Sequence, residues 1–237
     1  MRHIPLLEPG TLVKVSVKQR LNRFVVSVIR GGRLYRAHIN NTGRLEQFLI
    51  PGRTGFCLVP DKPGATDFRL IALAEPGAAA LIDTQLQMRA FEAGFEQGLY
   101  PWLQGLTRYR RDAALGRSRI DYRMEGTQGI MYLEAKSAVL RRGTAALYPD
   151  CPTLRGQKHV RELQAWAAGG NKAAILFIAA LPGIQTFRPN READPALYRQ
   201  LLRAAASGVD LVAIGMALDP SEACIYLYAP SLPVEWE

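Results

Sequence analysis

Two acids and one lysine near the middle of the chain have the types and spacing that chemistry needs. Glu134 and Lys136 lie two residues apart on a predicted strand, 130–139, so both side chains project to the same face. Asp121 lies on the preceding predicted strand, 118–124, and a hairpin would bring its carboxylate beside Glu134. Adjacent carboxylates repel unless a cation lies between them, and oxygen ligands suit Mg²⁺ or Mn²⁺. A lysine beside such a cation orients water and offsets charge on a phosphate, which fits a metal-dependent phosphodiesterase.

The same spacing also fits a purely structural ion pair. With six Lys and 21 acids in 237 residues, about 0.5 acid-x-Lys triplets are expected by chance, and the chain has one. Taken alone, the spacing favours an ordinary Glu–Lys pair at the edge of a sheet, so both interpretations remain open at this point.

The first 75 residues contain short β-rich segments separated by turn signals. Gly31-Gly32 separates two of them and predicts a hairpin. The polar run 40–45 predicts a turn and a cap before a short helix through Phe48. Five strands with one small helix predict a small barrel, for which an OB-like barrel is one candidate and any other five-stranded β domain the alternative. The predicted strands are Thr11–Val17, Phe24–Ile29, Leu34–Ile39, Thr54–Val59 and Phe68–Leu73.

The rest of the chain has an alternating pattern. Residues 75–80 (Glu-Pro-Gly-Ala-Ala-Ala) predict a linker, and a helix is expected over 84–97. From about residue 116 the order β-β-α-β-α-β predicts a mixed sheet covered by helices. Strands are expected at 118–124, 130–139, 172–181, 209–218 and 223–228, and helices at 154–168 and 195–207.

Composition and missing motifs exclude several classes of protein. Hydrophobic residues make up 48% of the chain, which excludes a disordered protein, and the longest apolar run has nine residues, too few to span a membrane. GxxxxGK[ST], GxGxxG after a strand, HExxH and GxSxG are all absent. Their absence argues against P-loop NTPases, Rossmann dehydrogenases, zinc proteases and serine hydrolases. Three scattered cysteines fit a reducing compartment, and with no signal peptide a cytoplasmic location is expected.

The net charge of +9 is concentrated in two parts of the chain. Residues 1–80 contain 12 Lys and Arg against 5 Asp and Glu, and residues 108–161 contain the same numbers, so each block has a charge of +7. Basic blocks of this kind attract polyanions through phosphate contacts and counterion release, although an arginine-rich codon bias would give the same totals. Nucleic acid is therefore a candidate partner.

Five ordered motifs make the chain resemble the sugar fermentation stimulation protein A (SfsA) family over nearly its whole length. The motifs are Asn41-Thr42-Gly43-Arg44-Leu45, Ile82-Asp83-Thr84, Gly116-x-Ser118-Arg119-Ile120-Asp121-Tyr122, Tyr132-Leu-Glu134-Ala-Lys136-Ser137 and Tyr148-Pro149-Asp150-x-x-Thr153-x-Arg155-Gly156-Gln157-Lys158-His159. The resemblance implies an N-terminal OB-like β-barrel, residues 1–80, followed by an α/β domain of the PD-(D/E)xK nuclease type with a mixed sheet, residues 81–237. It also implies DNA binding with little sequence preference and a regulatory link to sugar (maltose) metabolism.

The resemblance assigns roles by position. It makes Asp121 and Glu134 the carboxylates that hold Mg²⁺ or Mn²⁺, and Lys136 the residue that orients water or stabilises charge. Gln157 is implied as a supporting catalytic residue on the next helix. Asp112 stands where the family usually has Glu, and it is a candidate third acid or else a solvated charge.

Two further polar residues in these motifs have structural interpretations. Asp150 either supports the acidic site or caps the following helix, and His159 is either a base or a structural histidine; the structural interpretation is favoured for both. The sequence departs from the family where Asn40 replaces a common Pro, and where Gln85-Leu86-Gln87 replaces Pro-Asn.

Basic and aromatic residues supply the candidates for contact with nucleic acid. Solvated surface charge is the alternative for each basic residue, and a place in the core is the alternative for most of the aromatic ones. The candidates for phosphate contact are Arg36, Arg44, Arg117, Arg119, Arg155 and Lys158, and the barrel aromatics are Phe24, Tyr35, Phe48, Phe56 and Phe68.

Two functional hypotheses follow. In the first, the protein is a Mg²⁺-dependent nuclease that acts at Asp121, Glu134 and Lys136. In the second, the nuclease fold is catalytically silent and the two basic blocks bind the phosphate backbone of DNA for a regulatory purpose. Both hypotheses have DNA as the partner and involve no membrane.

Overall fold

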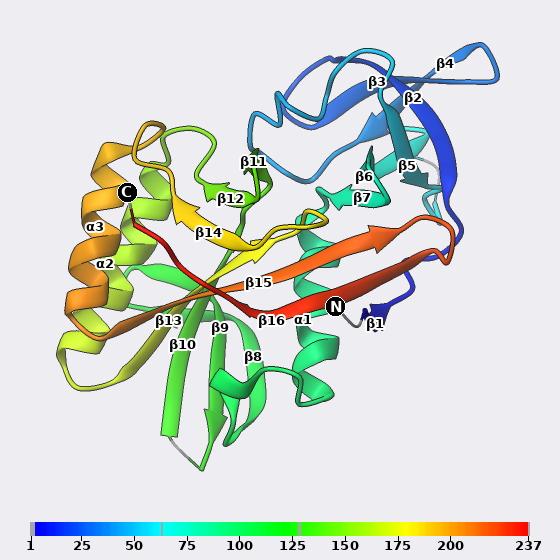
Figure 1. Cartoon of the computed structure of the whole chain (residues 1–237). Coiled ribbons are helices and arrows are strands. Elements are labelled where there is room, and N and C mark those ends of the chain that lie inside the picture. The colour runs from blue at the N-terminus through cyan, green and yellow to red at the C-terminus, as the bar shows by residue number, and fades with distance from the viewer. Residues whose placement is uncertain (1–2, 63, 128, 237) are drawn as a thin grey trace.

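The computed structural model describes residues 3–62, 64–127 and 129–236, and the first part of the chain folds as a closed barrel (Figure 1). Its strands neighbour one another in the order β4-β3-β2-β5-β6, and a parallel pairing of β4 with β6 closes the ring. This five-stranded arrangement confirms the expected OB-like barrel. The barrel strands are β2 (Val13–Arg20), β3 (Val25–Arg30), β4 (Arg33–His38), β5 (Thr54–Leu58) and β6 (Phe68–Glu75).

Local backbone conformation explains one predicted turn of the barrel and the absence of one predicted helix. Gly31 and Gly32 both have positive φ, 54° and 76°, as the tight turn between β3 and β4 requires. The helix expected through Phe48 does not form, because Leu45 has a φ of 54° and cannot start a right-handed helix. Residues 46–48 form a turn instead, and Phe48 is buried in the barrel core.

Residues 75–80 join the two halves as a hairpin and not as the expected linker. The chain turns at Gly77, where φ is 77°, and returns as β7 (Ala78–Leu81), which pairs along β6. All four residues of β7 are buried, and Ala79 also pairs with Leu218 of β15 (Val209–Asp219). One continuous sheet therefore runs from the barrel into the α/β domain.

The second half of the chain is an α/β domain with a mixed sheet, as expected. Strands β10, β13 and β15 are parallel, while β9 and β8 continue the sheet antiparallel on one side and β16 on the other. Its elements are α1 (Thr84–Glu96), η1 (Pro101–Leu103), β8 (Leu106–Leu115), β9 (Ser118–Gly126), β10 (Gly129–Ser137), α2 (Leu154–Ala168), β13 (Lys172–Ala179), α3 (Pro195–Ala206), β15 (Val209–Asp219) and β16 (Cys224–Leu232). Strand β1 (Ile4–Leu7) pairs with β16, and β11 (Leu140–Arg142), β12 (Ala145–Tyr148) and β14 (Thr186–Pro189) form a small second sheet.

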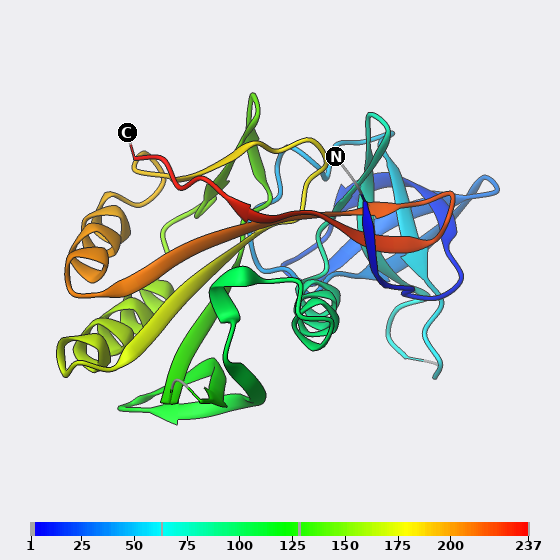
Figure 2. The same cartoon turned by 60° about the horizontal axis from the view of Figure 1, so that its bottom comes forward.

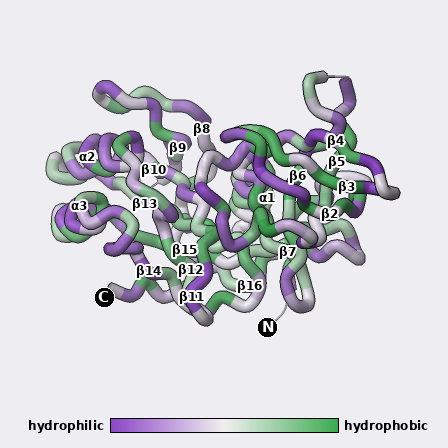
Figure 3. The backbone as a smooth tube through the Cα atoms, turned by 90° about the horizontal axis from the view of Figure 1, so that it is seen from above, coloured by the Kyte–Doolittle hydropathy of each residue, from purple (hydrophilic) through white to green (hydrophobic). Residues whose placement is uncertain are grey.

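The helices cover the sheet unevenly. Helices α2 and α3 pack together at the end of the molecule away from the barrel, whereas α1 contacts β7, β10 and β16 (Figure 2). The backbone is mostly apolar through the centre, around β15 and α1, and mixed along the outer helices (Figure 3). None of the helices in the described ranges is long and apolar enough to cross a membrane.

Candidate active site

The pairing of β9 with β10 brings Asp121 and Glu134 together. Tyr122 and Leu133 are register partners, so Asp121 and Glu134, one residue further along, share the opposite face. The backbone N–H of Ala135 donates to Oδ2 of Asp121 at 2.8 Å, and that of Asp121 donates to Oε2 of Glu134 at 3.2 Å. The hairpin therefore confirms the closeness that the sequence predicted.

Glu134 is 2% exposed and is compensated by two neighbours that share one of its oxygens. Nζ of Lys136 donates to Oε1, and Nδ1 of His159 contacts the same oxygen. Burial disfavours the charged carboxylate, but the Lys136 ammonium and His159 outweigh it and hold the pKa of Glu134 below its ordinary value. Burial also disfavours the charged ammonium of Lys136, but the negative charge of Glu134 outweighs it and keeps the pKa of Lys136 above its ordinary value.

Asp121 has the opposite electrostatic character. Burial, reinforced by the nearby charge of Glu134, raises the pKa of Asp121 from 3.8 to about 6. Its Oδ2 accepts from Ala135, whereas Oδ1 has no hydrogen-bond partner among the described residues. One oxygen of this destabilised carboxylate is thus available to a cation.

A cavity of about 410 Å³ opens in front of these residues, between the barrel and the α/β domain. The barrel contributes the loop 40–43 and Arg23 to its wall. The α/β domain contributes side chains from α1, β9 and β10, from the end of β12 and from the segment that leads from it into α2. These are Thr84, Gln87, Met88, Asp121, Glu134, Lys136, Ser137, Tyr148, Asp150, Cys151, Thr153 and Arg155.

The two departures from the family pattern lie at this junction. Oδ1 of Asn40 accepts the backbone N–H of Thr84 at 2.9 Å, and its Nδ2 donates to Asp83, the N-cap of α1. Nε2 of Gln87 donates to Oγ of Ser137 at 2.9 Å and to the carbonyl of Leu81. Both residues therefore connect α1 to the walls of the cavity.

Asp150 connects the two halves and does not cap α2 as expected. Thr153 is the N-cap, accepting the backbone N–H of Gly156. Asp150 Oδ2 instead accepts the backbone N–H of Arg44 at 2.6 Å. Gly43 permits this approach, because an added Cβ would lie 2.5 Å from the same oxygen.

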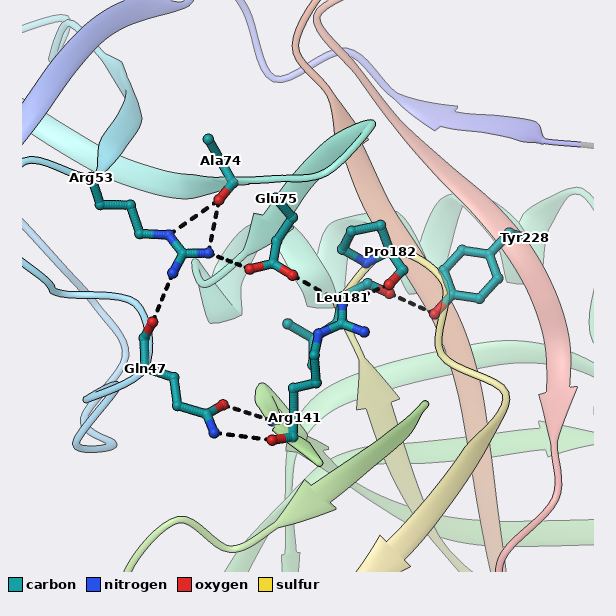
Figure 4. A network of polar contacts seen from close by, with 8 residues as sticks. All are labelled: Gln47, Arg53, Ala74, Glu75, Arg141, Leu181, Pro182 and Tyr228. Carbon is teal, nitrogen blue, oxygen red and sulfur yellow. Dashed lines mark hydrogen bonds and ion pairs between the residues drawn. The ribbon is translucent and has the colours of Figure 1, made fainter. Parts of the chain in front are cut away.

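A second polar contact between the halves centres on Glu75 (Figure 4). Its carboxylate pairs with Arg53 of the barrel and, at 3.1 Å, with Arg141 of β11. Arg141 also exchanges two hydrogen bonds with the side-chain amide of Gln47, at 2.9 and 3.0 Å. These contacts fix the barrel against the α/β domain and with it the separation of the cavity walls.

The structure separates the other predicted site residues from the acids. Gly156 on α2 lines the cavity, but the next residue, Gln157, projects about 100° away around the helix. Its Nε2 donates to Asp194 and not to Asp121 or Glu134. Asp112 lies on β8 at the register position of Asp121, but it is exposed and does not line the cavity. His159, expected to be structural, is buried beside Glu134 because it lies on the sheet-facing side of α2 with Val160 and Leu163.

The predicted phosphate-binding residues are all exposed, but they do not gather at one place. Of the six, Arg155 alone lines the cavity, at the start of α2. Nζ of Lys158 donates to the carbonyl of Arg117, and Arg44 lies 3.8 Å from Glu46. Sequence reasoning missed Arg23, because the turn after β2 reaches the cavity only through the packing of the barrel against the α/β domain.

The described residues contain no cluster of three or more His, Cys, Asp or Glu side chains that could hold a metal ion. Asp121 and Glu134 nevertheless present carboxylate oxygens to one cavity, and Mg²⁺ is commonly held by one or two carboxylates with water and substrate phosphate as its other ligands. The donor set therefore fits a hard divalent cation.

Comparison with known proteins covers both halves of the chain. The family model described as the SfsA N-terminal OB domain matches residues 19–82, and that of the sugar fermentation stimulation protein RE domain matches 85–222. Sugar fermentation stimulation protein homologs from Pyrococcus furiosus and Archaeoglobus fulgidus are 42% and 46% identical, over 93% and 84% of this chain and 96% and 86% of their own lengths. A solved structure described as Pyrococcus furiosus SfsA in complex with Ca²⁺ is 41% identical, covers 98% of this chain and 99% of that chain, and superposes with a TM-score of 0.93. Because these matches extend over the barrel and the α/β domain alike, the chain belongs to the sugar fermentation stimulation protein (SfsA) family.

Proposed function

We propose that this protein binds the phosphate backbone of DNA and hydrolyses phosphodiester bonds at Asp121, Glu134 and Lys136. The observation that carries the proposal is the convergence of two carboxylates and a lysine ammonium on one cavity between the barrel and the α/β domain, each of which contains one of the two basic blocks. Little sequence preference is expected, because the cationic groups near the cavity suit phosphate contacts, which carry no base information.

A divalent cation, Mg²⁺ in our proposal, would be held by Asp121 and Glu134. The Ca²⁺ named in the description of the Pyrococcus furiosus SfsA structure supports the binding of a hard divalent cation by this family. The chemistry that such a cation supplies is polarisation of a phosphodiester and acidification of a water molecule. The free Oδ1 of Asp121 and its raised pKa make this carboxylate the group that gains most from a cation.

The chain's own residues have separate tasks in this proposal. Lys136 lies in the cavity wall with its ammonium on Glu134, where it can donate a hydrogen bond to a phosphate oxygen or to a water. His159 holds Glu134 from the buried side and keeps its carboxylate in place. Arg23 and Arg155 line opposite walls and supply positive charge for the phosphates on either side.

A catalytically silent DNA-binding protein is the second candidate, and one observation favours it. Oε1 of Glu134 is already shared by Lys136 and His159, and Oε2 accepts the N–H of Asp121. A carboxylate with all these partners is stable without a cation. In either case we propose that a cytoplasmic protein of this family acts on sugar (maltose) metabolism through DNA.

Nicking of supercoiled plasmid in the presence of Mg²⁺ tests the proposal. We expect wild-type protein and Asp210→Asn, which removes an exposed acid of β15, to nick the plasmid. Glu134→Gln and Lys136→Ala should both abolish nicking while plasmid binding in Ca²⁺ is retained. Intact plasmid with wild-type protein under Mg²⁺ and Mn²⁺, with binding retained, would refute the nuclease and leave the silent DNA-binding protein.

A further inference from the structure

The barrel presents one exposed aromatic side chain close to the cavity. Phe24 is 46% exposed, whereas Phe48 and Phe68 are buried in the barrel core and Tyr35 packs edge-on against Phe68. Phe24 lies directly before β3, on the same turn as the cavity-lining Arg23. The ring is therefore exposed to solvent beside a residue that lines the cavity.

Arg23 couples this ring to the cavity wall. Its guanidinium carbon lies 5.6 Å from the centre of the Phe24 ring, within the range of a cation–π contact. Among the described residues, no carboxylate lies within ion-pair distance of Arg23 or of Arg155 on the other wall. The Arg23 guanidinium, which has no acidic partner in the described part of the chain, can therefore bind a nucleotide phosphate, while the exposed Phe24 ring beside it can stack on a base.

The turn that carries Phe24 is held in place by Arg20. This guanidinium donates to the carbonyls of Asn22 and Arg23 at 3.1 and 2.8 Å. It also donates to the carbonyls of Gly43 and Arg44 at 2.6 and 2.7 Å. One side chain thus fastens the turn 22–24 to the cavity loop 40–43, which orders the ring in advance of any ligand.

The start of α2, in the cavity wall formed by the α/β domain, also combines an exposed apolar side chain with a cationic one. Leu154, the first residue of α2, is 81% exposed and lies between the cavity-lining residues Thr153 and Arg155. Apolar and cationic groups therefore flank the acids on both sides. A polyanion that also carries flat apolar faces is the ligand that matches this arrangement.

We propose that Phe24 and Arg23 form a base-stacking subsite for an unpaired nucleotide, so that the substrate of the cavity is a single strand or an unpaired segment of DNA. In a duplex each base is already stacked between its neighbours, so an exposed ring beside the cavity wall gains a stacking partner only from an unpaired base. The inference rests on the proposed function for the position of the phosphates, but it concerns binding and not cleavage.

Fluorescence anisotropy with labelled oligothymidylate tests the subsite. We expect Phe24→Ala to weaken binding roughly 5- to 150-fold, the range given by loss of one stacked base. Phe24→Trp should restore affinity, because stacking needs a flat ring and not Phe itself. Leu34→Ala is the matched control, since Leu34 is 66% exposed at the far end of the same β3–β4 hairpin and should bind as wild type.

An oligonucleotide of the same length made of abasic sugar-phosphate units isolates the stacking contribution. Phe24→Ala should bind it as wild type does, because only phosphate contacts remain. Equal affinity of wild type and Phe24→Ala for oligothymidylate, or tighter binding of duplex than of single strand, would overturn the subsite. All titrations are done in Ca²⁺ without Mg²⁺, so failure of the nuclease proposal in the plasmid assay leaves this result unaffected.

Discussion

Asp121 and Glu134 fix one another through the backbone, since the N–H of Asp121 donates to Glu134 and the N–H after Glu134 donates back to Asp121. This exchange holds the buried carboxylate of Glu134 and the partly buried carboxylate of Asp121 side by side without a cation. Their protonation behaviour diverges, because Lys136 and His159 compensate Glu134 while Asp121 has no cationic hydrogen-bond partner. The pair therefore combines one acid whose pKa is held below its ordinary value with one whose pKa is raised to about 6.

The stability of the cation-free protein should fall as pH rises through the range in which Asp121 ionises. The pKa of Asp121 is about 6 in the folded protein, against an ordinary value of 3.8 that applies to the unfolded chain. Between pH 3.8 and about 6 the folded chain therefore keeps a proton that the unfolded chain has lost. We expect Asp121→Asn to raise the free energy of unfolding by about 1–3 kcal/mol at neutral pH and to have little effect below pH about 4. Urea denaturation in EDTA at several pH values measures this. A constant difference across that range would contradict it, and Asp210→Asn should show no such dependence.

Cation affinity should have the opposite dependence on pH. A cation competes with the proton for Asp121, so binding should strengthen as pH rises through about 6 and level off above it. Calorimetric titration with Ca²⁺ should show this trend in wild type, and in Asp121→Asn both weaker binding and a flatter dependence on pH. Affinity that is independent of pH in wild type would remove Asp121 from the ligand set.

Much of the α/β domain could be predicted because local patterns decide it. Helix α2 has the predicted bounds, 154–168, since Thr153 caps its start and Gly169-Gly170 follows its end. The closeness of Asp121 and Glu134 followed from one hairpin. These features depend on residues near one another in the chain.

Features that depend on distant partners were missed. The composition of residues 75–80 predicts a linker, yet β7 (Ala78–Leu81) is buried because β15, about 140 residues later, pairs with its edge. Strand β8 was not predicted, because its Arg-rich sequence shows no regular alternation of buried and exposed residues and Arg111 is compensated by Glu92 of α1, a partner distant in sequence. Arg23 is a cavity residue only because the barrel turns it toward α2, which no local pattern records.

Gly43→Ala should weaken the contact between the barrel and the α/β domain. The added Cβ would lie 2.5 Å from Oδ2 of Asp150, so the carboxylate must move and lose its hydrogen bond from Arg44. We expect a loss of about 1–3 kcal/mol in the free energy of unfolding, from chemical denaturation. The control Gly64→Ala meets no atom within 4 Å and should cost little. In an Asp150→Ala background the cost of Gly43→Ala should fall, leaving only the close approach of the added Cβ to Oδ1 of Asn41 at 3.1 Å, and an unchanged cost there would contradict this explanation.

Glu75→Gln should destabilise the protein more than the loss of an exposed ion pair does. Glu75 lies between Arg53 and Arg141, and removal of its charge leaves two guanidinium groups facing each other at the domain junction (Figure 4). We expect the free energy of unfolding to fall by about 2–3 kcal/mol, less than the roughly 3–5 kcal/mol of fully buried pairs, because both arginines are partly exposed. Glu192→Gln, which removes an exposed pair with Arg142, is the matched control and should cost about 0–1 kcal/mol. Equal losses in the two variants would show that Glu75 does not hold the barrel against the α/β domain.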